Sequence, residues 1–389
     1  MTGTCEVQGF VASGLEAVAA EFEHNFAARG ELGAAFSAYL DGDLVVDLWG
    51  GIADRSSARP WQRDTLQVIF SGTKGIVAAC LLILLERHQL DLDAPVAQYW
   101  PEFASAGKAR VLVRHLVSHT AGLPAVRRRL RVEDVTHGER MSELLAGQKP
   151  LLPYGEVVCY HALTFGWLCG ELVRRVDGRS IGRFIEDEVT KPLGLELWLG
   201  LPAELEERVA TLEVDPDLGT NPGPAAGVNH RTSLFALVEN NPPILAQDPY
   251  PWNSRAFHSA EIPGAGSIGT ARSIARLYGC LARGGELDGV RLVSEPTIQL
   301  GRTQLSRGHD PLGDKPLAFG VGFALQTERH SLGPPADAFG HGGAGGSMHG
   351  AWPSQRVGFS YAMNRMQDVE PVDPRADELL KTLYRCITG

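Results

Sequence analysis

The sequence has few of the features that mark a membrane protein or a disulfide-bonded secreted protein. Its longest apolar run, Ile76 to Leu85, is about half the length that a membrane-spanning helix needs. The six cysteines lie far apart and form no Cys-x-x-Cys motif: Cys5, Cys80, Cys159, Cys169, Cys280 and Cys386. Several of them fall within apolar stretches, where a free thiol behaves as a small hydrophobic side chain. The sequence therefore predicts reduced thiols and no membrane-spanning helix.

Basic residues are fewer than acidic ones. The chain has 36 Lys and Arg against 46 Asp and Glu, a formal charge of −10. The short cluster Arg127, Arg128, Arg129 and Arg131 has acidic residues close behind it, which is not the pattern of a nucleic-acid groove. The N-terminal segment lacks the basic and then apolar stretches of a signal peptide. We therefore expect a cytoplasmic protein with no nucleic-acid or membrane partner.

Strand patterns are present at both ends of the chain. Residues 34–54 read as two β-strands joined by a tight turn at Asp41-Gly42-Asp43. In the C-terminal third, residues 319–327, 339–353 and 356–364 predict an antiparallel meander. A helix over Ala376 to Cys386 is expected to close the chain.

Helical patterns lie mainly between these strands. Ser71 to His88 is apolar on nearly all sides, which predicts a buried helix. Further helices are predicted over Ala162 to Val176 and Gly269 to Gly284, and an amphipathic helix is expected to start near Ser13. The proline-rich stretch Asn240 to Ser254 is loop-like.

This order predicts an α+β fold in which an antiparallel sheet flanked by helices carries a mostly helical insert. We expect residues 1–75 and 260–389 to form one α/β domain from both ends of the chain. Residues 76–259 are expected to form the helical domain, with the active site in the cleft between the two. The stretch from Asn240 to Ser254 is a candidate wall of that cleft.

The strongest chemical signal is Ser71-Gly72-Thr73-Lys74, which opens the apolar helix. Residues at i and i+3 share one helix face, so the Lys74 amine can reach the Ser71 hydroxyl. Serine is a weak nucleophile until a base takes its proton, and burial at a helix N-terminus disfavours charged lysine. The Ser71 amide is also available to hydrogen-bond an oxyanion. Most Ser-x-x-Lys sequences are only a cap and a surface lysine, but the apolar setting of Lys74 favours catalysis.

Longer stretches carry a family resemblance. They are VIFSGTKGIVAACLLILLERHQLDLDAPVAQYWPEF, VLVRHLVSHTAGLP, YGEVVCYHALTFGWLCGELVRRVDGRSIGRFIEDEVTKPLGLE, SAEIPGAGSIGTARSIARLYGCLARGG and FGHGGAGGS. In this order they resemble the penicillin-recognising serine hydrolases: class C β-lactamases, penicillin-binding D-alanyl carboxypeptidases and family VIII carboxylesterases. The resemblance covers most of the chain and implies a β-lactamase/transpeptidase-like fold.

The resemblance also implies roles for individual residues. Ser71 would be the nucleophile and Lys74 its partner. Tyr160, as the tyrosine that opens the second motif, would relay protons as a phenolate during acylation and deacylation. A lone tyrosine is more often an amphipathic core residue, and only its place in the matched stretch favours the relay. The third motif falls on His341, Gly342 and Gly343, which would line the substrate site. The amide of Ala344 would be the second oxyanion donor beside that of Ser71.

Two positions depart from the lactamase pattern. Where the lactamases end the second motif with asparagine, this chain has Ala162, and where they begin the third with lysine it has His341. A neutral histidine supplies one donor and no fixed charge, which weakens recognition of an anionic substrate. This pattern is more similar to that of the family VIII carboxylesterases.

Four other patterns have competing interpretations. Gly178-Arg179-Ser180-Ile181-Gly182 fits the G-x-S-x-G elbow, but a helix precedes it and Ser180 is expected to cap the next helix. The glycine-rich run from Gly340 to Gly345 fits a dinucleotide motif without its strand–helix context. His115 and His119 have zinc-ligand spacing with no third ligand, so we expect them to pack or cap. His161 lies next to Tyr160, where we expect it to face another way.

These observations predict a serine carboxylesterase that hydrolyses short-chain esters through an acyl-enzyme. Its partner would be a small-molecule ester, and no metal or cofactor is implied. The alternatives are a β-lactamase, D-amino-acid peptidase or small-amide hydrolase on the same machinery. A relative that only binds a peptide or metabolite is a further alternative, against which the set Ser71, Lys74 and Tyr160 argues.

Overall fold

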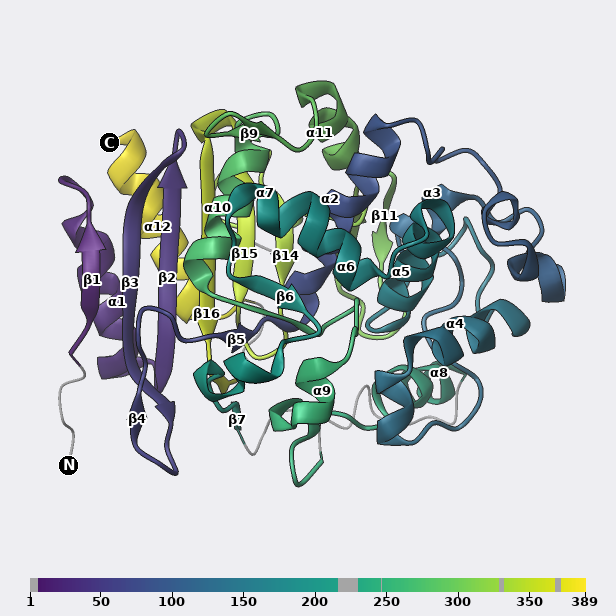
Figure 1. The fold of residues 1–389 in the computed structure, drawn as a ribbon, viewed down its shortest axis with the longest axis horizontal. Helices are drawn as coiled ribbons and strands as arrows, with labels where there is room; N and C mark the ends of the chain where they lie inside the picture. Colours follow the sequence, from purple (N-terminus) through teal and green to yellow (C-terminus); the bar gives the residue numbers. More distant parts are fainter. Residues whose placement is uncertain (1–5, 216–229, 246, 329–331, 368–371) are drawn as a thin grey trace.

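The computed structural model describes residues 6–215, 230–245, 247–328, 332–367 and 372–389. An antiparallel sheet forms the centre of the fold (Figure 1), in the order β1-β3-β2-β16-β15-β14-β13-β12-β11. Its strands from the N-terminal part are β1 (Gln8–Val11), β2 (Gly33–Leu40) and β3 (Asp43–Asp54), with β4 (Arg59–Pro60) paired to β3. Those from the C-terminal part are β11 (Ser306–His309), β12 (Pro316–Phe319), β13 (Ala324–Leu325), β14 (Phe339–Gly342), β15 (Met348–Trp352) and β16 (Val357–Met363).

Both predicted groups of strands are confirmed, and they join in one sheet. The predicted strand over residues 319–327 is divided, however, because a turn separates Phe319 at the end of β12 from Ala324–Leu325 of β13. The β2–β3 hairpin turns at Asp41 and Gly42, whose φ angles of +50° and +97° suit a tight hairpin turn. Residues 34–40 of β2 pair antiparallel with residues 357–363 of β16, the last long strand of the C-terminal meander. The two ends of the chain therefore share hydrogen bonds at the centre of the sheet.

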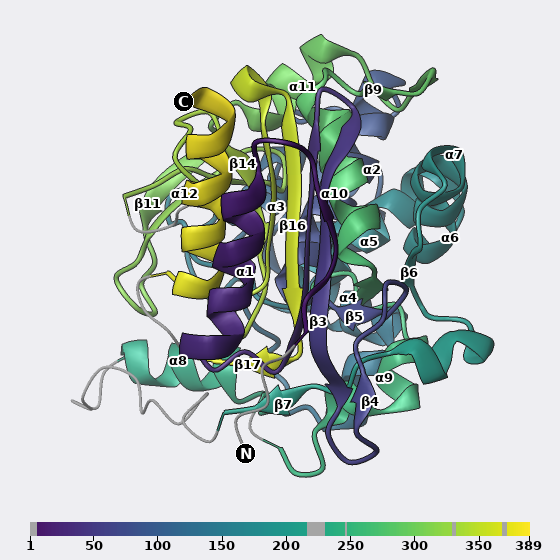
Figure 2. The same ribbon diagram turned by 90° about the vertical axis from the view of Figure 1, so that its left-hand side faces the viewer.

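Helices cover both faces of the sheet. Figure 2 shows α1 (Glu16–Ala28) and α12 (Pro374–Thr388) side by side on one face and α10 (Ala271–Ala282) on the other. Thr270 is the N-cap of α10: its side chain accepts a hydrogen bond from the Ser273 amide. These helices confirm the three predicted near Ser13, Gly269 and Ala376.

Helix α2 (Thr73–Glu86) is buried on all sides, from Thr73 to Leu84. It packs against α5 (Thr164–Asp177), α6 (Ile181–Ile185) and α11 (Glu295–Arg302). The predicted helix was expected to start at Ser71, but Ser71 lies in a short 3₁₀ turn, Phe70–Gly72, directly before α2. A three-stranded sheet of β5 (Gln67–Val68), β8 (Ser267–Gly269) and β6 (Leu197–Leu199) fixes the chain that enters this turn.

The remaining elements are short. The helices are α3 (Val113–Val117), α4 (Gly138–Gly147), α7 (Lys191–Leu193), α8 (His230–Glu239) and α9 (Arg255–Ser259). The strands are β7 (Glu213–Val214), β9 (Glu286–Leu287), β10 (Val290–Arg291) and β17 (Arg365–Met366). Residues 76–259 thus contribute β6 and β7, which pair with β8 and β17 outside that range. The division into domains 1–75 with 260–389 and 76–259 stays a prediction.

Candidate active site

The turn that carries Ser71 is tightly packed. Phe70 adopts a left-handed φ of +45°, and its ring packs edge-on against Trp252 at a centroid distance of 5.0 Å. The loop segment from Asn240 to Ser254 therefore reaches the residue before Ser71. On the other side, a Cβ at Gly72 would lie 2.5 Å from Cδ2 of His349 on β15. Neighbours on both sides therefore hold the Ser71 turn in place.

Lys74 lies one turn along, fully buried, with its amine 2.9 Å from the Ser71 Oγ. The same nitrogen donates to the carbonyl oxygens of Ala162 and Gly264, each at 2.7 Å. Burial lowers the pKa of Lys74 well below 10.5, and the nearby Cys169 thiol opposes this shift by less. A neutral amine has two N–H donors and one lone pair. With both donors taken by carbonyls, the lone pair is left for the Ser71 hydroxyl.

Tyr160 reaches Ser71 from another segment, the coil before α5. Its hydroxyl hydrogen-bonds Ser71, and the Lys74 amine lies 5.0 Å from the centre of its ring. Burial raises the pKa of Tyr160 above 10, and the hydrogen bond to Ser71 lowers it by less. Tyr160 is thus a neutral phenol in the resting site, whereas Lys74 is held toward its neutral, basic form.

The third motif lies against the Ser71 turn from the opposite side. A Cβ at Gly343 would lie 2.4 Å from the carbonyl oxygen of Ile69, so only glycine allows this approach. The next residue, Ala344, has an amide that donates to no acceptor within the described residues. The ring of His341 lies 6.0 Å from that of Tyr160, and its Nδ1 is 2.7 Å from the Gly342 carbonyl oxygen. The structure thus brings together all three predicted motifs.

Sequence reasoning missed two residues that hold Tyr160. Asp310, in the β11–β12 hairpin, accepts hydrogen bonds from the amides of Tyr160 (3.3 Å) and Leu312 (3.0 Å). The buried ring of His119 packs against Tyr160 at 5.0 Å and against Phe319 at 4.1 Å. Nothing in the spacing of Asp310 or His119 relates them to Tyr160, because the contacts come from segments about 40 or more residues apart.

Ser180 and His161, the alternative nucleophile and triad base, have structural roles as expected. Ser180 caps α6: its Oγ accepts from the Arg183 amide at 3.2 Å and donates to Glu261 at 2.7 Å. His161 uses both ring nitrogens structurally, accepting from the Leu123 amide at 3.1 Å and bonding the Cys159 carbonyl at 2.6 Å. Burial lowers the pKa of His161 to about 4. Neither residue is arranged as a nucleophile or a triad base.

The predicted histidine and glycine patterns also have structural roles. His115 accepts a hydrogen bond from the Leu112 amide at 3.1 Å, and His119 accepts one from the His161 amide at 3.0 Å. Gly340 to Gly345 runs from β14 into the turn that precedes β15, with no helix after it. Within the described residues, no three His, Cys, Asp or Glu side chains come together to hold a metal ion. In the same part of the chain, no helix is long and apolar enough to cross a membrane.

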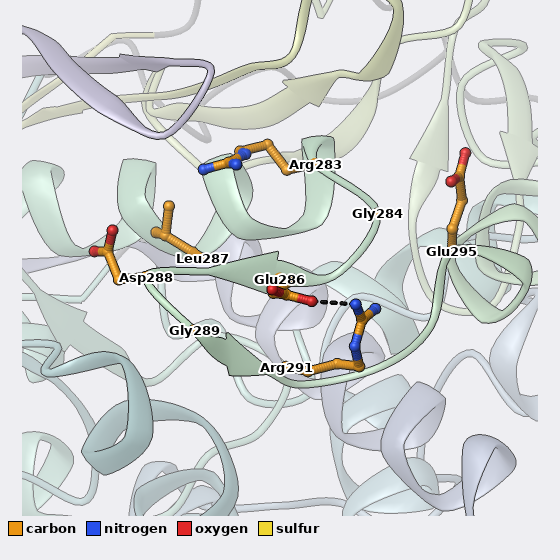
Figure 3. Close-up of a pocket in the computed structure, with 8 residues that line it drawn as sticks. All are labelled: Arg283, Gly284, Glu286, Leu287, Asp288, Gly289, Arg291 and Glu295. Carbon is orange, nitrogen blue, oxygen red and sulfur yellow. Dashed lines mark hydrogen bonds and ion pairs between the residues drawn. The ribbon is translucent and has the colours of Figure 1, made fainter.

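Two open surface hollows lie away from Ser71. One, of about 430 Å³, is formed where α10 leads into the β9–β10 hairpin (Figure 3). Glu286 and Arg291 pair within it, while Arg283 and Asp288 pair with Asp41 and Arg276 outside it. The other, of about 440 Å³, is lined by Arg59, Glu206 and His258 among others. Neither contains a residue of the three motifs, so the chemistry of the Ser71 turn, rather than hollow size, identifies the candidate site.

Known proteins share this fold and much of this sequence. Residues 18–384 match the family model described as Beta-lactamase. The esterase/beta-lactamase LipL of Mycobacterium tuberculosis (strain ATCC 25618 / H37Rv) is 36% identical over 361 residues, which cover 89% of this chain and 80% of LipL. The crystal structure of a family VIII carboxylesterase superposes with a TM-score of 0.90 at 37% identity, covering 98% of this chain and 100% of that one. A penicillin-binding protein homologue from Caulobacter crescentus gives 0.89 at 36% identity, with the same coverage.

Proposed function

Because the chain belongs to the beta-lactamase family of serine hydrolases, we propose that it is a carboxylesterase that cleaves short-chain esters through an acyl-enzyme on Ser71. The observation that carries this proposal is the position of Lys74. Its buried amine lies 2.9 Å from the Ser71 Oγ, with two carbonyls occupying its other bonds. That geometry supplies a serine hydroxyl with a neutral base, which is what a nucleophilic serine requires.

In the proposed acylation step, Ser71 Oγ attacks the ester carbonyl carbon as its proton passes to the Lys74 amine. The carbonyl oxygen becomes an oxyanion, which the amides of Ser71 and Ala344 stabilise. The C–O bond to the alcohol then breaks, and the alcohol oxygen takes up the proton through Tyr160. The products of this step are the free alcohol and an ester of Ser71.

Deacylation follows the same path in reverse. A water molecule attacks the acyl carbon, and its proton passes to the Tyr160–Lys74 pair. The same two amides hold the second oxyanion. Ser71 Oγ leaves, takes the proton back and releases the carboxylic acid.

Two residues support esters over β-lactams. The Ala162 methyl offers no hydrogen bond to a lactam side chain, and His341, unlike lysine, carries no permanent charge for a substrate carboxylate. Simple short-chain esters need neither contact, because they present neither a carboxylate nor an amide side chain. The similarity to a family VIII carboxylesterase and to LipL supports the same choice.

The second candidate is acyl transfer from a β-lactam or other amide. The Ser71–Lys74 geometry serves both classes, and the similar proteins include an esterase/beta-lactamase and a penicillin-binding protein homologue. The cysteines bear on the cellular setting. All five described cysteines are free and four of them are buried, which supports a reducing, cytoplasmic setting.

A panel of p-nitrophenyl esters assayed beside nitrocefin tests the substrate class. We expect kcat/KM for the best short-chain ester to exceed that for nitrocefin by about a hundredfold or more, or roughly 2.7 kcal/mol of transition-state preference. Comparable values for the two would refute the ester preference and leave the family's general hydrolase chemistry in place.

Matched serine variants make this test specific. Ser71→Ala is expected to abolish ester turnover and covalent labelling by a fluorophosphonate. Ser180→Ala loses only a helix cap and a bond to Glu261, so it is expected to keep both activities. Loss of labelling in Ser180→Ala alone would overturn the assignment of the nucleophile.

A further inference from the structure

Arg375 is a fully buried arginine that the proposed chemistry does not use. It is the second residue of α12, and all five of its N–H donors are engaged. Nε and Nη2 each donate a hydrogen bond to the Asp373 carboxylate, at 3.1 Å and 2.6 Å. Nη1 donates to the Glu31 carboxylate at 3.2 Å. The two remaining bonds go to backbone carbonyls, those of Arg365 (2.9 Å) and Gly345 (2.8 Å).

The bond to Gly345 reaches the turn that follows the proposed oxyanion donor. The connection between β14 and β15 is Gly343-Ala344-Gly345-Gly346-Ser347, in which three of the five residues are glycine. Gly345 and Gly346 have φ angles of +83° and +120°, a region that glycine enters freely. Two backbone hydrogen bonds lie within the turn, from the Gly343 amide to the Ser347 carbonyl (2.9 Å) and from the Gly346 amide to the Gly343 carbonyl (3.3 Å). Because glycine has little conformational preference, contacts from outside add to these bonds in fixing the turn.

Those outside contacts come from the end of β17 and from α12. The Gly345 carbonyl accepts from the Gln367 amide at 3.1 Å as well as from Arg375. A Cβ at Gly346 would lie 2.1 Å from Asp373 Oδ2, so the turn rests directly on the Asp373–Arg375 ion pair. Arg375 is the side chain that ties this turn to the helix.

We propose that Arg375 is a positioning residue for acyl transfer, holding the Gly345 carbonyl so that the neighbouring Ala344 amide stays aimed at the oxyanion. The inference rests on the proposed function of this site. It follows from the value of preorganisation: an oxyanion donor fixed before the reaction needs no reorganisation during it, and removal of one such donor typically costs about 10²–10³ in kcat. A buried ion pair is weak evidence for a purely stabilising role.

Arg375→Lys is the informative variant. Lysine keeps the positive charge for Glu31 and Asp373, but its single nitrogen cannot span those acids and the Gly345 carbonyl together. We expect kcat for a short-chain p-nitrophenyl ester to fall about ten- to a hundredfold while KM changes less than about threefold. The pH dependence of kcat is expected to keep its midpoint, because Lys74 and Tyr160 are untouched.

Tyr361→Phe is the matched control. The Tyr361 hydroxyl hydrogen-bonds Glu31 in the same buried cluster, and Phe removes that bond without altering any contact to Gly345. It is expected to lower Tm yet keep kcat within about threefold. If Arg375→Lys does not fold, Asp373→Asn replaces it: asparagine retains the helix cap but weakens the pair that orients Arg375, and kcat is again expected to fall at nearly constant KM.

The outcomes separate this inference from the proposed function. Ester turnover by the wild type with unchanged kcat in the folded Arg375 or Asp373 variant overturns the positioning role alone. An equal loss of kcat in Tyr361→Phe does the same, because it would show a general effect of the buried cluster. If the wild type cleaves no ester, the proposed substrate class is wrong, and the Arg375 comparison is made on nitrocefin, whose opening forms the same oxyanion.

Discussion

At the scale of single residues, the pKa values of Lys74 and Tyr160 shift in opposite directions, which assigns them different roles in proton transfer. Burial lowers the pKa of an amine and raises that of a phenol, because it disfavours whichever form is charged. Lys74 therefore loses its proton well below 10.5, while Tyr160 keeps its proton beyond 10. We infer that Lys74 is the resting base and that Tyr160 donates, rather than acting as a phenolate from the start.

This assignment predicts the pH dependence of kcat. The basic form of Lys74 is present above its lowered pKa and is lost as pH falls through it, so kcat is expected to rise with pH and level off well below 10.5. No descending limb is expected below about pH 10, because the raised pKa of Tyr160 keeps its phenol protonated there. A rise in kcat centred near 10.5 would contradict a buried, neutral Lys74.

The same pair predicts how two variants combine. Lys74→Ala and Tyr160→Phe are each expected to lower kcat about a hundredfold or more, as positioned acid–base groups do. In the double variant the losses are expected to be far from additive, since both groups move one proton between the same atoms. The measurement is kcat at saturating ester for the three variants, and additive losses would place the two residues in separate steps.

The sequence predicts these residues unequally. Ser71 and Lys74 follow from local spacing, and Tyr160 and Ala344 from the resemblance. Asp310 and Arg375 have no such signal, because each acts on a segment tens of residues away through one hydrogen bond to the backbone. Residues that position a site through tertiary contacts carry no local pattern from which to find them.

At the scale of elements, periodicity predicted the strands and helices well, and the difference lies where the backbone is unusual. The predicted helix from Ser71 begins instead at Thr73, after a turn with a left-handed Phe70. Hydrophobic periodicity predicts which side chains of a helix face the core. It does not predict the backbone conformation of this turn, which depends on the residues that pack against it. A Cβ at Gly75 would lie 2.0 Å from the Tyr278 hydroxyl, and one at Gly72 would meet His349. The glycines of Ser-Gly-Thr-Lys-Gly are therefore contact points of the α2 start.

Gly72→Ala tests this packing. The φ of Gly72 is −53°, so alanine is not strained there, and what opposes it is contact with the His349 ring (2.5 Å) and, less closely, with Ile69 Cδ1 (3.2 Å). The His349 ring is buried and bonded to Ser360 at 2.8 Å, so it cannot turn away freely. We expect a loss of about 1–3 kcal/mol in stability and at least about tenfold in kcat as the Ser71 turn shifts.

Gly147→Ala is the control for that substitution. Gly147 ends α4, and a Cβ there would meet nothing within 4 Å. It is expected to leave kcat unchanged and to raise stability slightly, by up to about 1 kcal/mol. Full activity in Gly72→Ala, measured beside this control, would show that the α2 start tolerates the displacement.

At the scale of the whole molecule, the two ends of the chain meet at one sheet. Strand β2 pairs with β16, and α1 packs on α12 across the same face. That closure was predictable, because strands at both termini and helices between them allow few other arrangements. Its consequence is that α12 serves the fold along most of its length and, by our inference, the active site only at its first turn.

This division can be tested along the one helix. Leu383 lies two turns beyond Arg375 in the core between α12 and the sheet and is fully buried. Leu383→Ala is expected to lower the free energy of unfolding by about 2–5 kcal/mol, the usual cost of truncating a buried leucine. Because Leu383 touches none of the three motifs, kcat of the folded protein is expected to stay within about twofold of wild type. Leu300→Ala, at a side chain 39% exposed on α11, is the control, and such surface changes usually alter the free energy of unfolding by no more than about 0.5 kcal/mol.

Arg375→Lys is expected to show the opposite pattern, a large loss of kcat in a protein that still folds. The measurements are denaturant unfolding and kcat at a temperature where all variants are folded. A fall in kcat with Leu383→Ala as large as that with Arg375→Lys would mean that α12 acts on the active site as one rigid body, rather than through its first turn.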